Sequence, residues 1–247
     1  MKAIILAAGL GTRLKPWTDT NPKALAPIDG TPVMEIVIRN LIRSGIDKIC
    51  INIHHFGEKI LEFLDSKDFA ADIVISDERE ALLDTGRGVA EAYRKLGGEG
   101  EVVVHNADIL SNASMEELFR INKERGDDVT LLVSDRQSGR KLIFDDNFNL
   151  QGWHDIAKDL YRPKKTEGKE LAFSGIYVIN EKAIKEIETL YGAGLLTPFP
   201  IMDYFLNENR RCAIRGTVDK NLKLLDIGKP ASLMQASDFL RLINYES

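Results

Sequence analysis

Two glycines and two cations follow the first apolar run of the sequence. Residues 6–14 read LAAGLGTRL, and residues 21–27 read NPKALAP. Glycine after a strand lets backbone N–H groups approach an anion without a Cβ in the way. Arg13 and Lys23 add a guanidinium fork and a point charge, which together could neutralise a triphosphate. The segment therefore indicates a phosphate site.

Neither of two better-known phosphate loops is present in this segment. The pattern GxxxxGK[ST] is absent. The pattern GxGxxG fails because Leu14 stands where the third glycine should be. Two glycines alone often form no more than a tight turn, so the two cations carry most of the signal.

Strand and helix patterns alternate through the first half of the sequence. Such a chain forms a mainly parallel sheet with helices on both faces, and ligands bind where the carboxyl ends of the strands meet the loops. Short apolar runs predict the strands, and apolar residues three and four apart predict the helices. The predicted strands are 2–7, 48–53, 72–76 and 101–105, and the predicted helices are 33–41, 58–64, 88–96 and 115–123.

Strands predominate after about residue 128, so we expect an antiparallel or mixed second half that extends the first sheet. The charged segment 155–170 is the best candidate for a mobile loop over a site. The predicted elements here are strands 129–133, 141–144 and 171–179, helices 181–190 and 200–208, and a last helix over 233–243 that follows Pro230.

Composition and charge exclude several classes of protein. The 33 Lys+Arg against 38 Asp+Glu give a net charge of −5, which argues against binding to nucleic acid or an anionic membrane. No apolar run is long enough for a membrane span or carries a secretion signal. The two cysteines and four histidines show no metal-ligand spacing. We therefore expect a soluble, cytoplasmic protein, and its state stays open between a monomer and a homo-oligomer.

Five motifs together resemble one enzyme family. Besides GxGTRL…PKxLxP they are LLDTGRG at 82–88, VHNAD at 104–108, FSGI at 173–176 and LDIGKP at 225–230. Their types and order resemble the sugar-1-phosphate nucleotidyltransferases, also called NDP-sugar pyrophosphorylases, over nearly the whole chain. Within the family the sequence is most similar to short members such as the N-acetylmuramate-1-phosphate uridylyltransferases and some mannose-1-phosphate guanylyltransferases.

The resemblance implies a Rossmann-like, three-layer α/β/α fold with a mixed, mostly parallel central sheet. One domain would span 1–247, with 1–127 mainly binding the nucleotide and 128–247 mainly binding the sugar phosphate. The implied reaction transfers a nucleotidyl group from an NTP to a sugar 1-phosphate, and we expect these substrates to be UTP and N-acetylmuramate 1-phosphate. The products are an NDP-sugar and pyrophosphate. Because the sugar phosphate is already an anion, catalysis needs positioning and charge neutralisation rather than a general base.

The resemblance also implies roles for particular residues. Arg13 would stabilise the leaving pyrophosphate, and Lys23 the α-phosphate or the sugar phosphate. Asp108 and Asp226 would bind Mg²⁺, which favours oxygen ligands shared with phosphates. The nucleotide would be bound by Leu6, Ala8, Gly9, Gly11, Thr12, Leu83, Thr85, Gly86 and Asn106, and the sugar by Trp153, Ser174 and Gly175.

Structural roles compete with these functional ones. An aspartate after a strand is often only a helix cap or a turn former. For Asp108 the rival caps are Ser111 and Ser114, and for Asp226 the alternative is a turn before Gly228. The 83–88 segment could be a glycine turn with a helix cap at Asp84-Thr85, and 173–175 could be strand core with a glycine bulge. Trp153 could likewise belong to the core.

The chain departs from the family pattern at several positions. Ala107 replaces the usual glycine before the first metal aspartate, and Arg87 occupies a glycine-rich loop where it could contact phosphate or alter base choice. Glu80-Ala81 replaces the glutamine of thymidylyltransferases, which disfavours dTTP. The usual sugar-phosphate lysine is not recognisable; Lys158, Lys164 and Lys165 are candidates. The purpose of Arg136 and Arg140, which flank a predicted hairpin, is not evident from the sequence.

Three other functions are consistent with parts of the pattern. A mannose-1-phosphate guanylyltransferase is the alternative within the class. A glycosyltransferase would normally show Asp-x-Asp at the fourth strand, where this chain has Asn106-Ala107-Asp108. A non-catalytic sugar-nucleotide-binding regulatory subunit should have lost one of the four charged residues, which are all present. The functional prediction fails if the structure places Asp226 and Lys23 on opposite sides of the molecule from Asp108.

Overall fold

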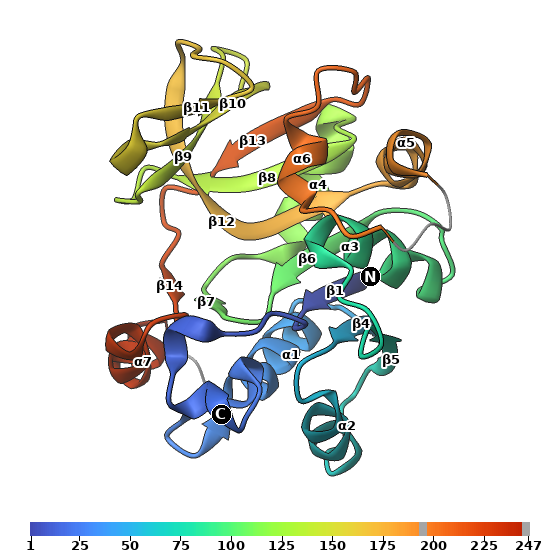
Figure 1. Ribbon diagram of the computed structural model, residues 1–247, viewed down its shortest axis with the longest axis vertical. Helices are drawn as coiled ribbons and strands as arrows, with labels where there is room; N and C mark the ends of the chain where they lie inside the picture. The colour runs from blue at the N-terminus through green and yellow to red at the C-terminus, as the bar shows by residue number, and fades with distance from the viewer. Residues whose placement is uncertain (193–196, 244–247) are drawn as a thin grey trace.

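The computed structural model describes residues 1–192 and 197–243. A mixed sheet, ten-stranded in these described residues, forms its centre (Figure 1). The strand order is β11-β10-β9-β12-β6-β1-β4-β5, and β8 joins β12 to β13. The strands of the N-terminal half are β1 (Lys2–Leu6), β4 (Lys48–Ile53), β5 (Asp72–Asp77) and β6 (Val102–Asn106), and all their pairings with one another are parallel.

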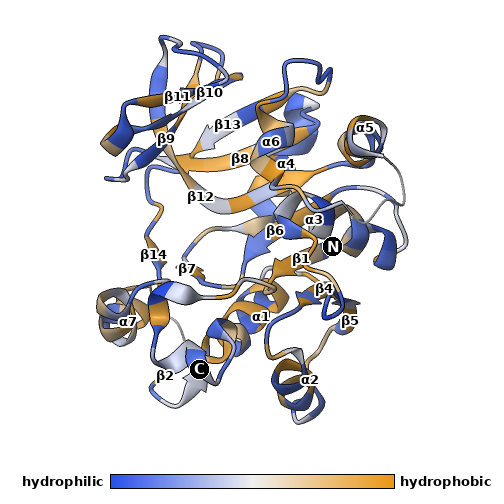
Figure 2. Cartoon of the chain, viewed as in Figure 1, coloured by the Kyte–Doolittle hydropathy of each residue, from blue (hydrophilic) through white to orange (hydrophobic). Residues whose placement is uncertain are grey.

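Alternating side chains of β1 enter two separate cores. Ala3 and Ile5 belong to the core on one face of the sheet, and Ile4 belongs to the core on the other. All three side chains are fully buried, as expected for a parallel strand covered on both faces. The hydropathy colouring shows the same apolar band along the central strands (Figure 2). This arrangement confirms the α/β fold with a mixed central sheet.

The helices cover both faces of the sheet. One core is formed with α1 (Val33–Arg43), α2 (Gly57–Asp65), α4 (Met115–Arg125) and α7 (Pro230–Leu242), and the other with α3 (Asp84–Lys95), α5 (Glu181–Tyr191) and α6 (Ile201–Phe205). Among the described helices, none is both long and apolar enough to cross a membrane.

The topology places a crevice beside β1. The chain leaves β1 for β4 on one side, and β6 occupies the other side. A change of direction of this kind opens a space at the carboxyl ends of the strands, where α/β proteins bind ligands. Two short strands, β7 (Ile109–Ser111) and β14 (Leu224–Asp226), pair antiparallel just beyond β6. A further short pair, β2 (Pro27–Ile28) and β3 (Thr31–Pro32), precedes α1.

The C-terminal half extends the sheet, as predicted. β12 (Lys169–Ile179) pairs antiparallel with β6, β8 (Val129–Ser134) and β9 (Arg140–Phe144), and β8 pairs parallel with β13 (Ile214–Val218). The prediction of a loop over 155–170 is wrong in part. β10 (Leu150–Asp155) and β11 (Leu160–Arg162) form a hairpin there, because the polar residues lie on an outer strand pair that needs no apolar run.

Several helix boundaries also differ from the prediction, among them those of α3, α6 and α7, which begins at Pro230. α3 begins at Asp84, four residues before the predicted start at residue 88, and so it contains Gly86 and Gly88. Glycine lowers helix propensity, but here close neighbours require it, as described below. α6 ends at Phe205 rather than at residue 208.

Candidate active site

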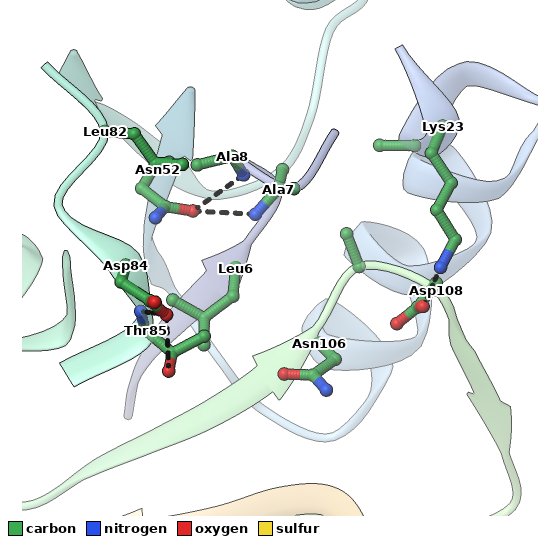
Figure 3. Close-up of a pocket in the computed structure, with 13 residues that line it drawn as sticks. Leu6, Ala7, Ala8, Lys23, Asn52, Leu82, Asp84, Thr85, Asn106 and Asp108 are labelled. Carbon is green, nitrogen blue, oxygen red and sulfur yellow. Dashed lines mark hydrogen bonds and ion pairs between the residues drawn. The ribbon is translucent and has the colours of Figure 1, made fainter. Parts of the chain in front are cut away.

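A cavity of about 280 Å³ opens at the carboxyl ends of the parallel strands. Its walls come from the end of β1, the end of β4, the start of α3 and the segment after β6 (Figure 3). Seven of the sequence-predicted site residues line it, namely Leu6, Ala8, Gly9, Lys23, Thr85, Asn106 and Asp108. Three of the five sequence motifs thus meet in the crevice at the topological switch point.

The loop after β1, residues 7–13, is called here the first loop. The backbone N–H groups of Gly9 through Arg13 donate to no protein acceptor within the described parts of the chain. Successive free N–H groups favour an anion. Gly11 packs against the Cβ of Lys23, where its own Cβ would lie 2.9 Å away. Thr12 and Arg13 lie exposed in a short 3-10 helix, Thr12–Leu14.

Lys23 forms an ion pair with Asp108 (Figure 3). The two residues are 85 positions apart in the sequence, and their side chains are only 15% and 20% exposed. Screening by water is therefore weaker than for a surface pair. Lys23 lies in a 3-10 helix, Lys23–Leu25, that leads into β2 and α1, so packed structure rather than a free loop holds the cation at the cavity.

Three charged side chains, one of them Lys23, converge at Gly228. A Cβ on Gly228 would lie 2.7 Å from Arg13 Nη2, 2.8 Å from Asp226 Oδ1 and 2.9 Å from Lys23 Nζ. Because Lys23 also contacts Asp108, all four predicted charged residues meet at one place. The arrangement in which Asp226 and Lys23 lie opposite Asp108 is therefore excluded.

One structural alternative for Asp108, a helix cap, does not hold, although the residue does lie in a turn between β6 and β7. The N-cap of α4 is Ser114, whose side chain accepts from the Glu117 backbone N–H over 3.2 Å, so the Asp108 carboxylate is not used as that cap. The alternative for Asp226 holds for one oxygen, because Oδ1 accepts from the Gly228 N–H over 2.8 Å. Asp226 thus forms the turn and also faces the two cations.

The donor set at this place fits a magnesium ion. Two carboxylates come from β14 and from the segment between β6 and β7, and no cluster of three His, Cys, Asp or Glu residues suited to a metal occurs in the described chain. Mg²⁺ is commonly bound by one or two carboxylates and completed by substrate phosphates and water. A closed transition-metal site would need more protein ligands.

The segment 78–86, called here the second loop, forms the opposite wall. Thr85 lines the cavity, and its Oγ1 accepts from the Ile201 N–H over 2.9 Å. Leu83 is buried, and Gly86 donates its N–H to the Phe199 carbonyl over 2.8 Å. A Cβ on Gly86 would collide with the Phe199 ring at 2.2 Å, so this glycine serves the packing of α3.

The predicted cap at Asp84-Thr85 takes another form. Leu83 occupies the N-cap position of α3 without a side-chain cap bond. Asp84 Oδ1 instead accepts from the adjacent Thr85 N–H over 2.6 Å. Asp84 itself lines the cavity. Its backbone φ is +59°, a strained conformation of the kind that gathers at functional sites.

Two of the three predicted sugar-binding residues lie together in a bulge of β12, and the third lies in β10. Gly175, in a bulge of β12, packs against the Asn106 side chain, where a Cβ would lie 2.7 Å from Nδ2. Ser174 is buried, and its Oγ accepts from the Ile176 N–H over 3.1 Å, so the hydroxyl is bonded within the bulge. Trp153, in β10, does not line the cavity; it packs against the second core with the Arg140 guanidinium 5.9 Å from its ring.

Arg87 does not reach the cavity, contrary to the idea of a phosphate contact. Its side chain is buried, and its Nη2 donates to the carbonyls of Tyr191 and Gly192 at the end of α5 over 3.0 and 2.8 Å. A cation is favoured there by the free carbonyls of the helix terminus. Arg87 therefore ties α3 to α5.

Sequence reasoning missed Asn52 and Glu78 near the site and left Arg136 without a role. Asn52 lines the cavity from the end of β4, and buried Glu78 bonds to it over 2.9 Å. A polar residue at the carboxyl end of a buried strand was the available signal for Asn52. Arg136 donates Nη2 to the Phe173 carbonyl over 2.8 Å. Burial lowers the pKa of Arg136, and the nearby Asp226 carboxylate opposes that shift.

Comparison with known proteins gives one family. A family model described as nucleotidyl transferase matches residues 2–242. N-acetylmuramate alpha-1-phosphate uridylyltransferase of Neisseria meningitidis is 29% identical over 96% of this chain and 96% of that protein. The protein of the same name from Caulobacter vibrioides is 39% identical over 44% of this chain and 46% of that protein. Mannose-1-phosphate guanylyltransferase 1 of Arabidopsis thaliana is 29% identical over 76% of this chain and 52% of that protein. The matches with the last two thus span about half of their lengths.

Solved structures show the same fold. A putative glucose-1-phosphate thymidylyltransferase from Bacillus anthracis superposes with a TM-score of 0.79, covering 100% of this chain and 98% of that one at 20% sequence identity. At this identity the similarity supports the architecture alone. It agrees with the sheet and the layers described above.

Proposed function

The chain belongs to the nucleotidyl transferase family and is an enzyme of the class that makes nucleotide sugars from sugar 1-phosphates, and on this premise we propose its substrates and site. The nucleotide is UTP, and the acceptor is N-acetylmuramate 1-phosphate. The products are the UDP-sugar, a cell-wall glycan precursor, and pyrophosphate. Two relatives that carry this activity in their names support the choice, one of them along 96% of the chain.

The convergence of four charged residues around Gly228 carries the proposal for the site. Arg13, Lys23 and Asp226 surround one point, and Lys23 also pairs with Asp108. Two anionic substrates that must meet repel one another, so a site that joins them needs cations at their contact. This set provides two cationic side chains and two carboxylates that could bind a divalent cation.

In the proposed reaction, a phosphate oxygen of the sugar 1-phosphate attacks the α-phosphorus of UTP. One O–P bond forms, the bond from the α-phosphorus to the bridging oxygen breaks, and pyrophosphate leaves with the electron pair. The nucleophile is already ionised, so no residue need remove a proton. Lys23 holds the α-phosphate or the sugar phosphate at the cavity, and Arg13 neutralises the departing pyrophosphate. The free N–H groups of the first loop hold the remaining phosphate oxygens.

Asp108 and Asp226 would hold Mg²⁺, as is common in this family. The ion, when bound, supplies charge neutralisation for phosphate oxygens. The chain's own contribution is the placement of the two carboxylates. β14 pairs with β7, and this pairing holds Asp226 beside the segment that carries Asp108.

A half-buried arginine favours an acidic sugar as the acceptor. Within the described residues Arg136 forms no ion pair with any carboxylate, and it contacts the backbone immediately before Ser174 and Gly175. Its Nε is buried without a partner. A buried guanidinium N–H without an acceptor costs free energy, which an anion bound there would offset. N-acetylmuramate carries a carboxylate on its lactyl group, whereas mannose and N-acetylglucosamine carry none.

A pyrophosphate-release assay tests the substrates directly. The pure protein is mixed with Mg²⁺, each of the common NTPs and a panel of sugar 1-phosphates. The expected result is the fastest release with UTP and N-acetylmuramate 1-phosphate. Fastest release with GTP and mannose 1-phosphate would replace this assignment with the guanylyltransferase alternative. No release with any pair would indicate a regulatory subunit instead.

A further inference from the structure

A carboxylate is buried beside the cavity without a Lys or Arg partner in the described chain. Glu78 is 3% exposed. Its Oε1 accepts from Asn52 Nδ2 over 2.9 Å, and its Oε2 accepts from the Leu83 N–H over 3.1 Å. Burial raises the pKa of Glu78, and these two hydrogen bonds oppose the shift. Burying a carboxylate that hydrogen-bonds only to neutral donors costs free energy. The presence of Glu78 at this position therefore needs a physical explanation.

Asn52 continues the hydrogen bonds from Glu78 to the first loop. Its Oδ1 accepts from the Ala7 N–H over 2.7 Å and from the Ala8 N–H over 3.3 Å (Figure 3). An amide side chain can turn either end toward a neighbour, but a carboxylate only accepts. Glu78 therefore fixes the Nδ2 end of Asn52 toward itself and the Oδ1 end toward the backbone of the first loop.

These contacts link the two walls of the cavity. Leu83 belongs to the second loop, and Ala7 and Ala8 belong to the first. The connection runs from one backbone through Glu78 and Asn52 to the other, and both side chains are buried from water. Hydrogen bonds in such surroundings are stronger than in water, and a missing partner is more costly.

Helix α3 leaves room for this pair. A Cβ on Gly88 would lie 2.8 Å from Glu78 Oε1 and 3.0 Å from Asn52 Nδ2. The glycine lies inside the helix, where it costs about 1 kcal/mol relative to alanine. Close approach to the Asn52–Glu78 pair is the physical reason for a glycine at this position.

We propose that Asn52 and Glu78 are positioning residues that set the spacing of the first and second loops for nucleotide binding. The inference rests on the proposed function only in taking the cavity as the nucleotide site. The proposed role depends on which atom donates and which accepts in each hydrogen bond. The carboxylate can therefore be moved from position 78 to position 52 if an amide replaces it at position 78.

An exchange of the two side-chain types tests this directly. Glu78→Gln turns an amide N–H toward either Asn52 or Leu83, both of which donate. Asn52→Asp brings two carboxylates into contact. In the double variant the carboxylate introduced at position 52 accepts from the first loop and from the amide introduced at position 78. The carbonyl of that amide accepts from the Leu83 N–H, so every bond is restored.

The readouts are the Kd of UTP and the separate KM values for UTP and sugar 1-phosphate. Each single variant is expected to raise the Kd and KM of UTP by about tenfold to a hundredfold, the loss of a hydrogen bond to a charged group, with the KM of the sugar phosphate within about threefold. The double variant is expected to return to within about threefold of the wild type. A double variant no better than the worse single variant, or single variants with wild-type UTP affinity, would overturn the proposal.

Gly88→Ala provides a second test, which can be made even if the single variants at positions 52 and 78 fold poorly. Alanine favours the helix, but its Cβ enters the space between Glu78 and Asn52, so the KM of UTP should rise while the chain stays folded. Gly139→Ala is the matched control, because nothing lies within 4 Å of a Cβ there. Wild-type UTP affinity in a folded Gly88→Ala variant would contradict the role of the pair.

The outcomes also separate this inference from the proposed function. The wild type could bind UTP, with an affinity that the variants lower, but release no pyrophosphate with any sugar 1-phosphate. That result would contradict the proposed function and support the positioning role. If the wild type is active and all variants keep its UTP affinity, the positioning role falls alone. A wild type that binds no NTP overturns both.

Discussion

Ile227 donates its backbone N–H to the Asp108 carbonyl over 3.0 Å. This bond continues the pairing of β14 with β7, in which Asp226 lies opposite Ile109. The two acidic residues are thus held at neighbouring backbone positions although they are 118 positions apart in the sequence. Backbone pairing, rather than any direct contact between the carboxylates, brings the halves of the proposed metal site together.

Asp108→Asn is expected to lower turnover by about a hundredfold or more while the free energy of unfolding changes little. The substitution keeps the shape and removes the charge that Lys23 and the proposed Mg²⁺ require. Steady-state pyrophosphate release and urea unfolding measure the two effects. Ser114→Ala is the contrasting variant: it removes the α4 cap and should cost about 1 kcal/mol of stability with activity retained. The opposite pattern would make Asp108 the structural residue.

Gly228→Ala is expected to abolish most activity without unfolding the protein. The added Cβ would lie under 3.0 Å from Arg13, Lys23 and Asp226 atoms, so the charged groups must move apart. Circular dichroism and pyrophosphate release would be compared with those of Gly139→Ala, whose Cβ meets nothing within 4 Å. Normal turnover in the Gly228 variant would show that these groups do not act at a shared point.

Arg13→Ala is expected to lower kcat by about a hundredfold and to weaken UTP binding much less, because the leaving pyrophosphate gains its charge in the transition state. Rapid-mix kinetics and equilibrium binding give the two numbers. Lys15→Ala is the control from the same segment, since Lys15 pairs with Asp19 at the surface. A larger effect on binding than on kcat would make Arg13 a binding residue only.

Arg136→Gln is expected to change the choice of sugar. If Arg136 binds the lactyl carboxylate, kcat/KM should fall by about tenfold to a hundredfold for N-acetylmuramate 1-phosphate and by less than about threefold for N-acetylglucosamine 1-phosphate, which lacks that group. Arg140→Gln serves as the control, because Arg140 is exposed and lies over Trp153. An equal loss on both sugars would assign Arg136 to the β12 bulge alone.

His105 is expected to make stability depend on pH. Burial lowers the pKa of His105 to about 4 from 6.5, while the Asn106 carbonyl and the Asp108 carboxylate oppose the shift. The unfolded chain therefore binds more protons between these two values. The contribution is complete above about pH 6.5 and is lost as the pH falls toward 4, amounting to about 2 kcal/mol between pH 7 and 5. Urea unfolding at both pH values should show a smaller difference for His105→Gln than for the wild type; equal differences would refute the assignment.

The local patterns predicted the buried elements well. β1, β4 and β6 are mainly apolar, as is typical of strands covered on both faces. The prediction was weaker where the chain is polar or rich in glycine. β11 lies within the predicted loop over 155–170, because an outer strand needs few apolar residues. The predicted start of α3 is four residues too late because Gly86 suggests a turn, whereas the close approach of Phe199 requires this glycine inside the helix.

The candidate site was predictable as a set of motifs but not as a geometry. Residue types and their order indicated Arg13, Lys23, Asp108 and Asp226, because the sequence itself gives the positions of glycines, cationic side chains and carboxylates. Asn52, Glu78 and Arg136 carry no motif, and only their neighbours in space give them a role. Ser174 and Trp153 were predicted from the sequence to bind the sugar, but Ser174 is hydrogen-bonded within the β12 bulge and Trp153 packs against a core.

The sequence by itself determined the class of the fold and the kind of chemistry, because periodicity and side-chain types are local properties of the chain. Tertiary structure decided which charges meet, which glycines make room for a neighbour and which arginine lies beside the β12 bulge. These properties depend on distances between residues that lie far apart along the chain. Strand order and the β7–β14 pairing set those distances, and no single segment encodes either of them.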